Sequence, residues 1–213
     1  MKMSKKQGLE MLQILDFPTI ELIDPNLLDE NSSVLKQGLS VRTSPKTDKE
    51  NNVYLPSIHN CKNLSEIREF IKKNQSQYNI LVHRTLKTEQ IGSISRYVGE
   101  QDKVIIEIFQ DFEKRKEGII KNRAIVPIMG EKFRIDQLEL KEKNAEEYKV
   151  FSEVIRDVKY MPFQKFDAEF VVEKGKIVFT DLTILERKDQ KYAEELRKQT
   201  QEKKKERSEE IEK

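Results

Sequence analysis

Residues 166–183 carry the acidic side chains whose spacing points most directly to chemistry. Apolar residues alternate with mostly acidic ones before Lys174-Gly175, so the segment is predicted to form a β-hairpin with a tight turn. A three-residue loop would put Glu169 and Asp181 on one face, whereas a two-residue loop would put them on opposite faces. Neighbouring carboxylates repel each other unless a cation bridges them, and oxygen ligands suit Mg²⁺. The alternative is an ordinary hairpin whose acids face solvent.

Two other charged residues lie in segments that are predicted to be strands. Arg42 stands among hydroxyl residues in the segment 40–44, where a guanidinium can bind phosphate through two hydrogen bonds. Glu107 interrupts the apolar run 104–109, and a buried acid there needs a partner such as a ribose hydroxyl, a metal ion or a lysine. The alternatives are a surface arginine paired with a carboxylate, and a glutamate that strand alternation turns toward solvent.

The composition argues against several other classes of function. The formal net charge is +2, so nucleic acid is not indicated as a partner. His59, His83 and Cys61 lack a zinc-binding spacing, and the sequence contains no P-loop, dinucleotide fingerprint or nucleophile elbow. A lone cysteine, no signal-peptide core and no apolar run of membrane-spanning length predict a soluble, cytoplasmic protein without membrane contact.

Hydrophobic periodicity and capping residues predict an α+β domain. Helices are expected over 4–15, from Asn63 or Ser65 through Ile71, and over 145–158. Strands are expected over 20–23, 38–44, 78–84, 92–97, 104–109, 118–127 and 132–140, and a loop over 45–52.

The segment 186–213 differs from the rest because it is rich in charged helix formers and poor in apolar residues. We therefore expect a domain over 1–185 that is followed by a charged helical tail. The sparse apolar side chains favour a solvated single helix. The alternative is a helix that docks on a protein partner.

Several short motifs follow one another along the chain. Lys5 precedes the first helix, and Asp181 follows the last motif by twelve residues. The motifs are Val41-Arg-Thr-Ser44, Val82-His-Arg-Thr85, Ile105-Ile-Glu-Ile108 and Asp167-Ala-Glu169. In this order and spacing they resemble the N-terminal ATP-grasp domain of the phosphoenolpyruvate synthase and pyruvate phosphate dikinase family, which carries A-V-R-S-S, V-Q-R-M, I-E-A and D-I-E stretches. The similarity spans about residues 3–183.

This resemblance implies a two-lobed ATP-grasp-like nucleotide-binding domain with mostly antiparallel sheets and a charged C-terminal helix. It implies that Lys5 and Arg42 contact the ATP phosphates and act in catalysis. It also implies that Arg84 and Glu107 contribute to the nucleotide site.

The resemblance further implies that Glu169 and Asp181 bind Mg²⁺, and it leaves Asp167 and Glu173 to solvent. The expected function is binding of ATP and Mg²⁺, with a phosphotransferase, kinase or ligase-like activity on an unknown acceptor.

The sequence departs from the family pattern at three places. No glycines flank Lys5, the segment 110–116 replaces a G-L-G-E turn, and Thr183 stands at the position of a family arginine. The alternative function is therefore a catalytically inactive binding or regulatory module, whose charged tail engages a protein or RNA partner.

Overall fold

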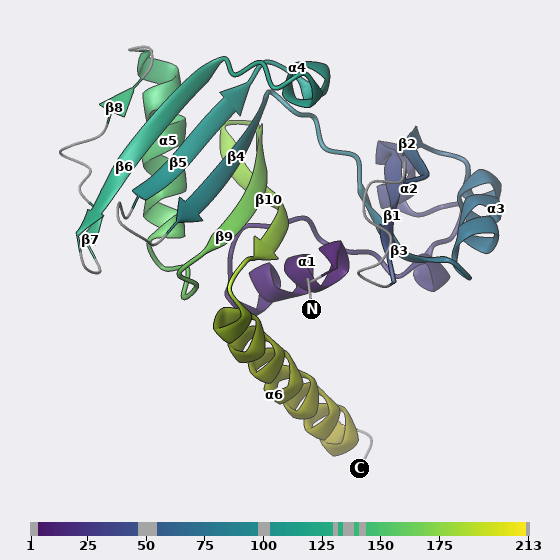
Figure 1. Ribbon diagram of the computed structural model, residues 1–213. Coiled ribbons are helices and arrows are strands. Elements are labelled where there is room, and N and C mark those ends of the chain that lie inside the picture. Colours follow the sequence, from purple (N-terminus) through teal and green to yellow (C-terminus); the bar gives the residue numbers. More distant parts are fainter. Residues whose placement is uncertain are drawn as a thin grey trace.

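The computed structural model describes residues 4–46, 55–97, 103–129, 132–133, 139–140 and 144–211. These residues form two lobes, each built on its own antiparallel β-sheet (Figure 1). The predicted α+β, two-lobed architecture is confirmed. Most of the predicted loop 45–52 and part of the predicted strand 132–140 lie outside the described residues.

The small lobe consists of the N-terminal sheet and the helices beside it. Its elements are η1 (Pro25–Leu27), α2 (Ser33–Gln37), β1 (Leu39–Pro45), β2 (Ser57–Cys61), α3 (Leu64–Asn74) and β3 (Tyr78–Arg84), with the strand order β2-β1-β3. Of the two candidate caps, Asn63 and Ser65, it is Asn63 that caps α3, by accepting hydrogen bonds from backbone N–H groups of its first turn. Leu39, Val41 and Ile67 are buried in the core of this lobe.

The large lobe has the strand order β10-β9-β4-β5-β6-β7, and β8 pairs with β6. Its elements are β4 (Gln90–Tyr97), β5 (Lys103–Phe109), α4 (Phe112–Lys116), β6 (Asn122–Met129), β7 (Lys132–Phe133), β8 (Glu139–Leu140), α5 (Ala145–Val158), β9 (Phe166–Glu173) and β10 (Lys176–Ile184). Helix α5 covers one face of the sheet (Figure 1), and alternate strand residues such as Ile106 and Phe170 share its apolar core with Phe151. The other face carries the remaining strand side chains, including the acids.

The predicted hairpin is confirmed, but its two acids reach one face by an unexpected route. The turn has only two residues, Lys174 and Gly175, both with positive φ. A regular ladder from such a turn would place Glu169 opposite Thr180. The register instead shifts between Phe179 and Asp181, so that Thr180 is an extra residue and Asp181 pairs with Glu169. The β-bulge, and not a three-residue loop, therefore places Glu169 and Asp181 on the same face.

Helix α1 (Lys5–Ile14) lies directly against the backbone of β10. Ser4 and Gln7 form a reciprocal capping box that begins the helix immediately before Lys5. Gly8 allows the close approach, because a Cβ atom there would stand 2.2 Å from the carbonyl oxygen of Leu182. The helix thus holds Lys5 next to the strand that carries Asp181.

The C-terminal segment forms the predicted helix, α6 (Arg187–Ile211), but the interpretation as a fully solvated helix is wrong for its first half. Ala193 is fully buried, and Asp189 accepts a hydrogen bond from the backbone N–H of Gln164. Arg197 donates to Glu10 of α1 at 2.5 Å. The start of α6 is therefore packed against the large lobe and α1, with Ala193 and Leu196 at the apolar core.

Some elements differ from the sequence expectations. Residues 20–23 form no strand: Thr19, just before them, makes an isolated bridge to Phe179 of β10, whereas Ile23 at their end donates to the backbone of Val82 in β3. The elements α2, β2 and α4 were not predicted, because each has only five residues and little periodicity. Of the residues that the structure describes, no helix is long and apolar enough to cross a membrane.

We predict that Gly8→Ala destabilises the protein, although alanine favours helices over glycine by roughly 1 kcal/mol. The added Cβ atom would overlap the backbone of Leu182, which cannot move without shifting β10. Urea unfolding should show a loss of about 1–3 kcal/mol. The exposed Lys6→Ala on the same helix serves as the control and should leave the midpoint almost unchanged. A Gly8→Ala protein as stable as the original would contradict the close packing of α1 on β10.

Candidate functional site

A row of polar residues crosses the sheet face that α5 leaves open. Arg123 pairs with Glu107, Glu107 with Ser93, Ser93 with Glu169, and Glu169 with Asp181. Cross-strand partners point to the same face, so these side chains stand side by side over the strands β6, β5, β4, β9 and β10. The sheet thus carries an acidic pair on its two strands nearest to α1.

Lys5 binds both members of this acidic pair. Its Nζ lies 3.2 Å from Oδ2 of Asp181 and 3.9 Å from Oε2 of Glu169. The Lys5 side chain is 23% exposed, so the contact is screened less by solvent than a surface ion pair. The capped start of α1 therefore delivers a cation to the two carboxylates.

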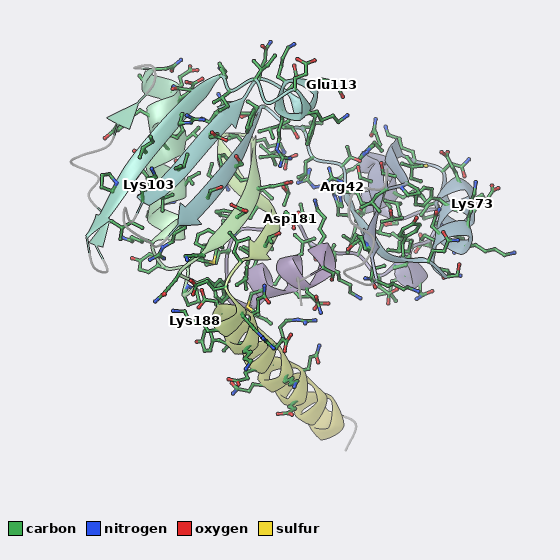
Figure 2. All side chains as sticks on the ribbon, in the orientation of Figure 1. Arg42, Lys73, Lys103, Glu113, Asp181 and Lys188 are labelled. Atoms are coloured by element: carbon green, nitrogen blue, oxygen red, sulfur yellow. The ribbon has the colours of Figure 1, made fainter. Side chains whose placement is uncertain are left out.

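Arg42 approaches the same carboxylates from the small lobe. It lies in β1, with Leu81 and Ser57 as its cross-strand neighbours. Figure 2 labels Arg42 on the small lobe and Asp181 on β10, on the sides where the lobes face each other. Burial lowers the pKa of Arg42, while the charges of Glu169 and Asp181 oppose that shift. Arg42 is thus electrostatically coupled to the acidic pair.

A further cation, Arg115, was missed by the sequence analysis. It belongs to α4 and forms an ion pair with Oε1 of Glu169. Asp111 caps α4 by accepting from the backbone N–H of Lys114, and this Asp followed by Glu113 was the available signal for a helix start. The lack of apolar periodicity in so short a helix concealed it.

The pKa values of the two carboxylates are shifted in opposite directions. Burial would raise the pKa of Glu169, but Lys5 and Arg115 outweigh burial and hold it below its ordinary value. Burial raises the pKa of Asp181, Glu169 adds to the increase, and Lys5 only partly opposes it. The nearby cations thus favour the ionised form of Glu169, whereas burial favours the protonated form of Asp181.

A cavity of about 190 Å³ lies next to Arg42, between the lobes. His83 lines it from the small lobe, Phe112 from α4, and Val171 and Thr180 from the hairpin. Burial and the nearby cations lower the pKa of His83 to about 4, so the imidazole is neutral at pH 7. Arg42 is the member of the charged cluster that lines this cavity, together with apolar residues such as Phe112 and Val171. The cavity is smaller than the roughly 300 Å³ at which pockets for drug-sized ligands begin.

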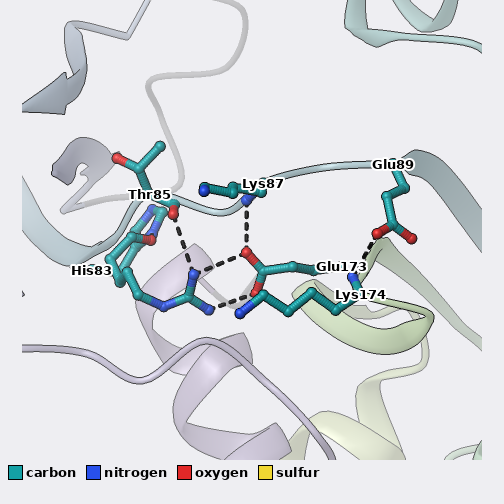
Figure 3. Close-up of polar contacts among 7 residues, drawn as sticks. His83, Thr85, Lys87, Glu89, Glu173 and Lys174 are labelled. Carbon is teal, nitrogen blue, oxygen red and sulfur yellow. Dashed lines mark hydrogen bonds and ion pairs between the residues drawn. The ribbon is translucent and has the colours of Figure 1, made fainter. Parts of the chain in front are cut away.

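The linker between β3 and β4 is fastened to the tip of the hairpin (Figure 3). Arg84 donates to both oxygens of Glu173, at 2.8 and 2.6 Å, and the backbone N–H of Lys87 donates to Glu173 at 2.7 Å. Glu89 in turn accepts from the backbone N–H groups of Lys174 and Gly175, at 2.8 and 3.1 Å. We call these contacts the linker clamp. The expectation that Glu173 faces solvent is wrong, since its side chain is 7% exposed and lies within the clamp.

The remaining residues of the predicted site lie apart from the cluster around Lys5. Arg84 is engaged in the linker clamp, and Glu107 accepts hydrogen bonds from Arg123. Glu107 shares the polar row, but two strand spacings, or about 10 Å, separate it from Glu169. Asp167 lies on the same face as Glu169, and one of its carboxylate oxygens is buried without a hydrogen-bond partner. The structure thus brings together Lys5, Glu169 and Asp181, with Arg42 coupled to them, and holds the others elsewhere.

The donor set of the cluster fits a magnesium ion that also binds phosphate. The described residues contain no group of three or more histidine, cysteine, aspartate and glutamate side chains placed to hold a metal alone. Glu169 and Asp181 offer carboxylate oxygens from adjacent strands, and Mg²⁺ commonly takes one or two carboxylates and completes its shell with water and nucleotide phosphate. Lys5, Arg42 and Arg115 could balance the charge of such phosphates.

The chain was compared with known proteins by sequence and by structure. No protein-family model matches the sequence, and no curated protein matches it. Among solved structures, ATP citrate lyase from Methanothrix soehngenii in complex with citrate and coenzyme A has a TM-score of 0.56 at 13% identity, over 90% of this chain and 52% of that chain. The chain has an ATP-grasp fold. At this identity the likeness shows the fold alone.

Two further solved structures give the same picture of coverage. ATP citrate lyase from Methanosaeta concilii in complex with (3S)-citryl-CoA has a TM-score of 0.55 at 12% identity, over 90% of this chain and 51% of that chain. N5-carboxyaminoimidazole synthetase from Staphylococcus aureus has a TM-score of 0.49 at 9% identity, over 86% of this chain and 44% of that chain. The chain spans about half the length of the proteins that it resembles.

We predict that Glu173→Gln destabilises the protein by about 2 kcal/mol at pH 7, because it weakens the hydrogen bonds to Arg84 and Lys87 in a buried position. Arg84 holds the pKa of Glu173 down to about 2, below its ordinary value of 4.5. This contribution is therefore fully present above pH 4.5 and is lost as the pH falls from about 4.5 toward 2.

Urea unfolding at several pH values measures the difference between the two proteins. The control is Glu113→Gln, which removes half of an exposed ion pair in α4 and should leave stability unchanged. A difference between Glu173→Gln and the original protein that stays constant from pH 7 to pH 2 would rule out the ionised clamp as its source.

Proposed function

We propose that the protein binds ATP together with Mg²⁺ between its two lobes and transfers the terminal phosphoryl group to an acceptor. The proposal rests chiefly on one observation: the acidic pair on the large lobe is in contact with Lys5 from α1 and is electrostatically coupled to Arg42 of the small lobe. Cations for the phosphates and acids for the metal are thus assembled within reach of one another. The solved ATP citrate lyases, whose name includes ATP, share the fold and support the proposal by analogy.

The neighbouring cavity offers room for one planar ring system rather than a whole nucleotide. We place the base against its apolar wall, formed in part by Phe112 and Val171, with the phosphates reaching from Arg42 toward Lys5. This arrangement keeps the ring away from water. It also keeps the charged phosphates near the carboxylates. The triphosphate would then cross the boundary between the lobes.

In the proposed reaction, this chain's residues position and neutralise rather than react covalently. Lys5 and Arg42 hold the phosphates, and Glu169 and Asp181 hold Mg²⁺, which supplies charge neutralisation to the phosphate oxygens. The bond from the terminal phosphorus to its bridging oxygen breaks, and ADP leaves with the electron pair. An oxygen or nitrogen of the acceptor forms the new bond and releases its proton to solvent.

We predict that isothermal titration calorimetry detects binding of ATP in the presence of Mg²⁺. Asp181→Asn should weaken this binding at least about tenfold, because one of two metal-holding carboxylates loses its charge. Lys5→Ala should weaken it by a similar factor through the phosphates. The controls are Asp16→Asn and Lys6→Ala, which change the same residue types at exposed positions outside the cluster.

The outcomes separate binding from catalysis. No binding heat with the original protein, or an unchanged affinity in Asp181→Asn, would refute the nucleotide site. Binding without phosphate release or transfer to any added acceptor would refute the enzymatic part alone, and would favour a nucleotide-binding module.

A further inference from the structure

Arg115 contacts Glu169 of the acidic pair although it belongs to α4, outside the row of polar residues. Its guanidinium reaches from α4 to Oε1 of Glu169, while Lys5 approaches the other oxygen, Oε2. Both oxygens of Glu169 therefore face cations of the protein. A metal ion that binds Glu169 therefore competes electrostatically with these cations for the carboxylate.

The neighbours of Arg115 in α4 have partners of their own. Lys114 pairs with Glu117, and Lys116 pairs with Glu113, both at 2.8 Å and both along the helix surface. Arg115 is the basic residue of this helix that the structure directs to Glu169. Its side chain is 28% exposed, compared with 71% for Lys116, so Arg115 is held in the cluster rather than extended into solvent.

Three cations gather around the acidic pair. Lys5, Arg42 and Arg115 carry three positive charges against the two carboxylates of Glu169 and Asp181. Arg115 and Arg42 repel each other, and this repulsion contributes to the lowered pKa of Arg42. An added anion would relieve the repulsion, and a guanidinium can bind a phosphate group through two parallel hydrogen bonds.

We propose that Arg115 is a third phosphate-binding cation, which occupies Glu169 in the ligand-free protein and moves to the triphosphate when Glu169 ligates the metal ion. This inference rests on the proposed function. Arg115 and the metal ion compete for Glu169 as long as no phosphate is present. The triphosphate removes the competition by giving the guanidinium another partner, so nucleotide and metal bind with positive coupling.

Before the exchange, Arg115 already reaches from α4 to β9 through this ion pair. The exchange replaces one charge-assisted contact with another, so the net change in free energy is small compared with loss of either contact. Arg115 thus acts as a positioning residue for Glu169 before binding and as a ligand of phosphate after it.

Calorimetric titrations of Arg115→Ala with Mg²⁺ alone, and with a non-hydrolysable ATP analogue in the presence of Mg²⁺, test the proposal. Mg²⁺ alone should bind several-fold more tightly than to the original protein, because Glu169 has lost a competing cation. The analogue should bind about tenfold more weakly, because one charge-assisted contact to phosphate is missing. In both titrations the affinity of Arg115→Lys should lie between those of Arg115→Ala and the original protein. Lys116→Ala, which changes an exposed residue next to Arg115, should match the original protein.

A role of Arg115 that is only structural would weaken both titrations, because a misplaced Glu169 would serve the metal poorly in either case; that result would overturn the proposal. Unchanged affinity for the analogue would overturn it as well. Thermal unfolding of each variant establishes that it is folded before titration. If the original protein binds the analogue and Arg115→Ala does so equally well, only the role of Arg115 fails. If the original protein binds no analogue, both the proposed function and the role of Arg115 fail.

Discussion

The contact of Lys5 with Glu169 and Asp181 is the interaction on which the arrangement of the candidate site depends. Two carboxylates on adjacent strands repel each other, so their side-by-side placement needs a nearby cation. Helix α1 provides it because the missing side chain of Gly8 lets the helix lie on the backbone of β10. A cation from the first helix of the chain thereby stabilises acids from its last hairpin.

The relative position of the lobes depends on a second set of charges. The linker clamp ties the segment between β3 and β4 to the hairpin tip through Arg84, Glu173 and Glu89. The same hairpin therefore carries the acidic pair at its middle and anchors the linker at its turn. Because Arg42 belongs to the small lobe and Asp181 to the hairpin, the clamp influences how closely these two residues approach each other.

The sequence predicted those features that depend on local pattern. Alternation located the hairpin and β5, and Asn63 marked the start of α3, because strand period and capping are local properties. The bulge at Thr180 was not predictable, since it depends on how β10 meets the segment around Thr19 as well as β9. Glu173 could not be recognised as buried, because its partner Arg84 is 89 residues away in the chain. The resemblance to a known family singled out Lys5, whose neighbours along the sequence carry no such signal.

A crystal structure of the protein with Mg²⁺ and a non-hydrolysable ATP analogue tests the central claim most directly. The account predicts a metal ion on Glu169 and Asp181, with the phosphates in contact with Lys5 and Arg42. Nucleotide bound elsewhere on the protein, or a metal ion that contacts neither carboxylate, would contradict it.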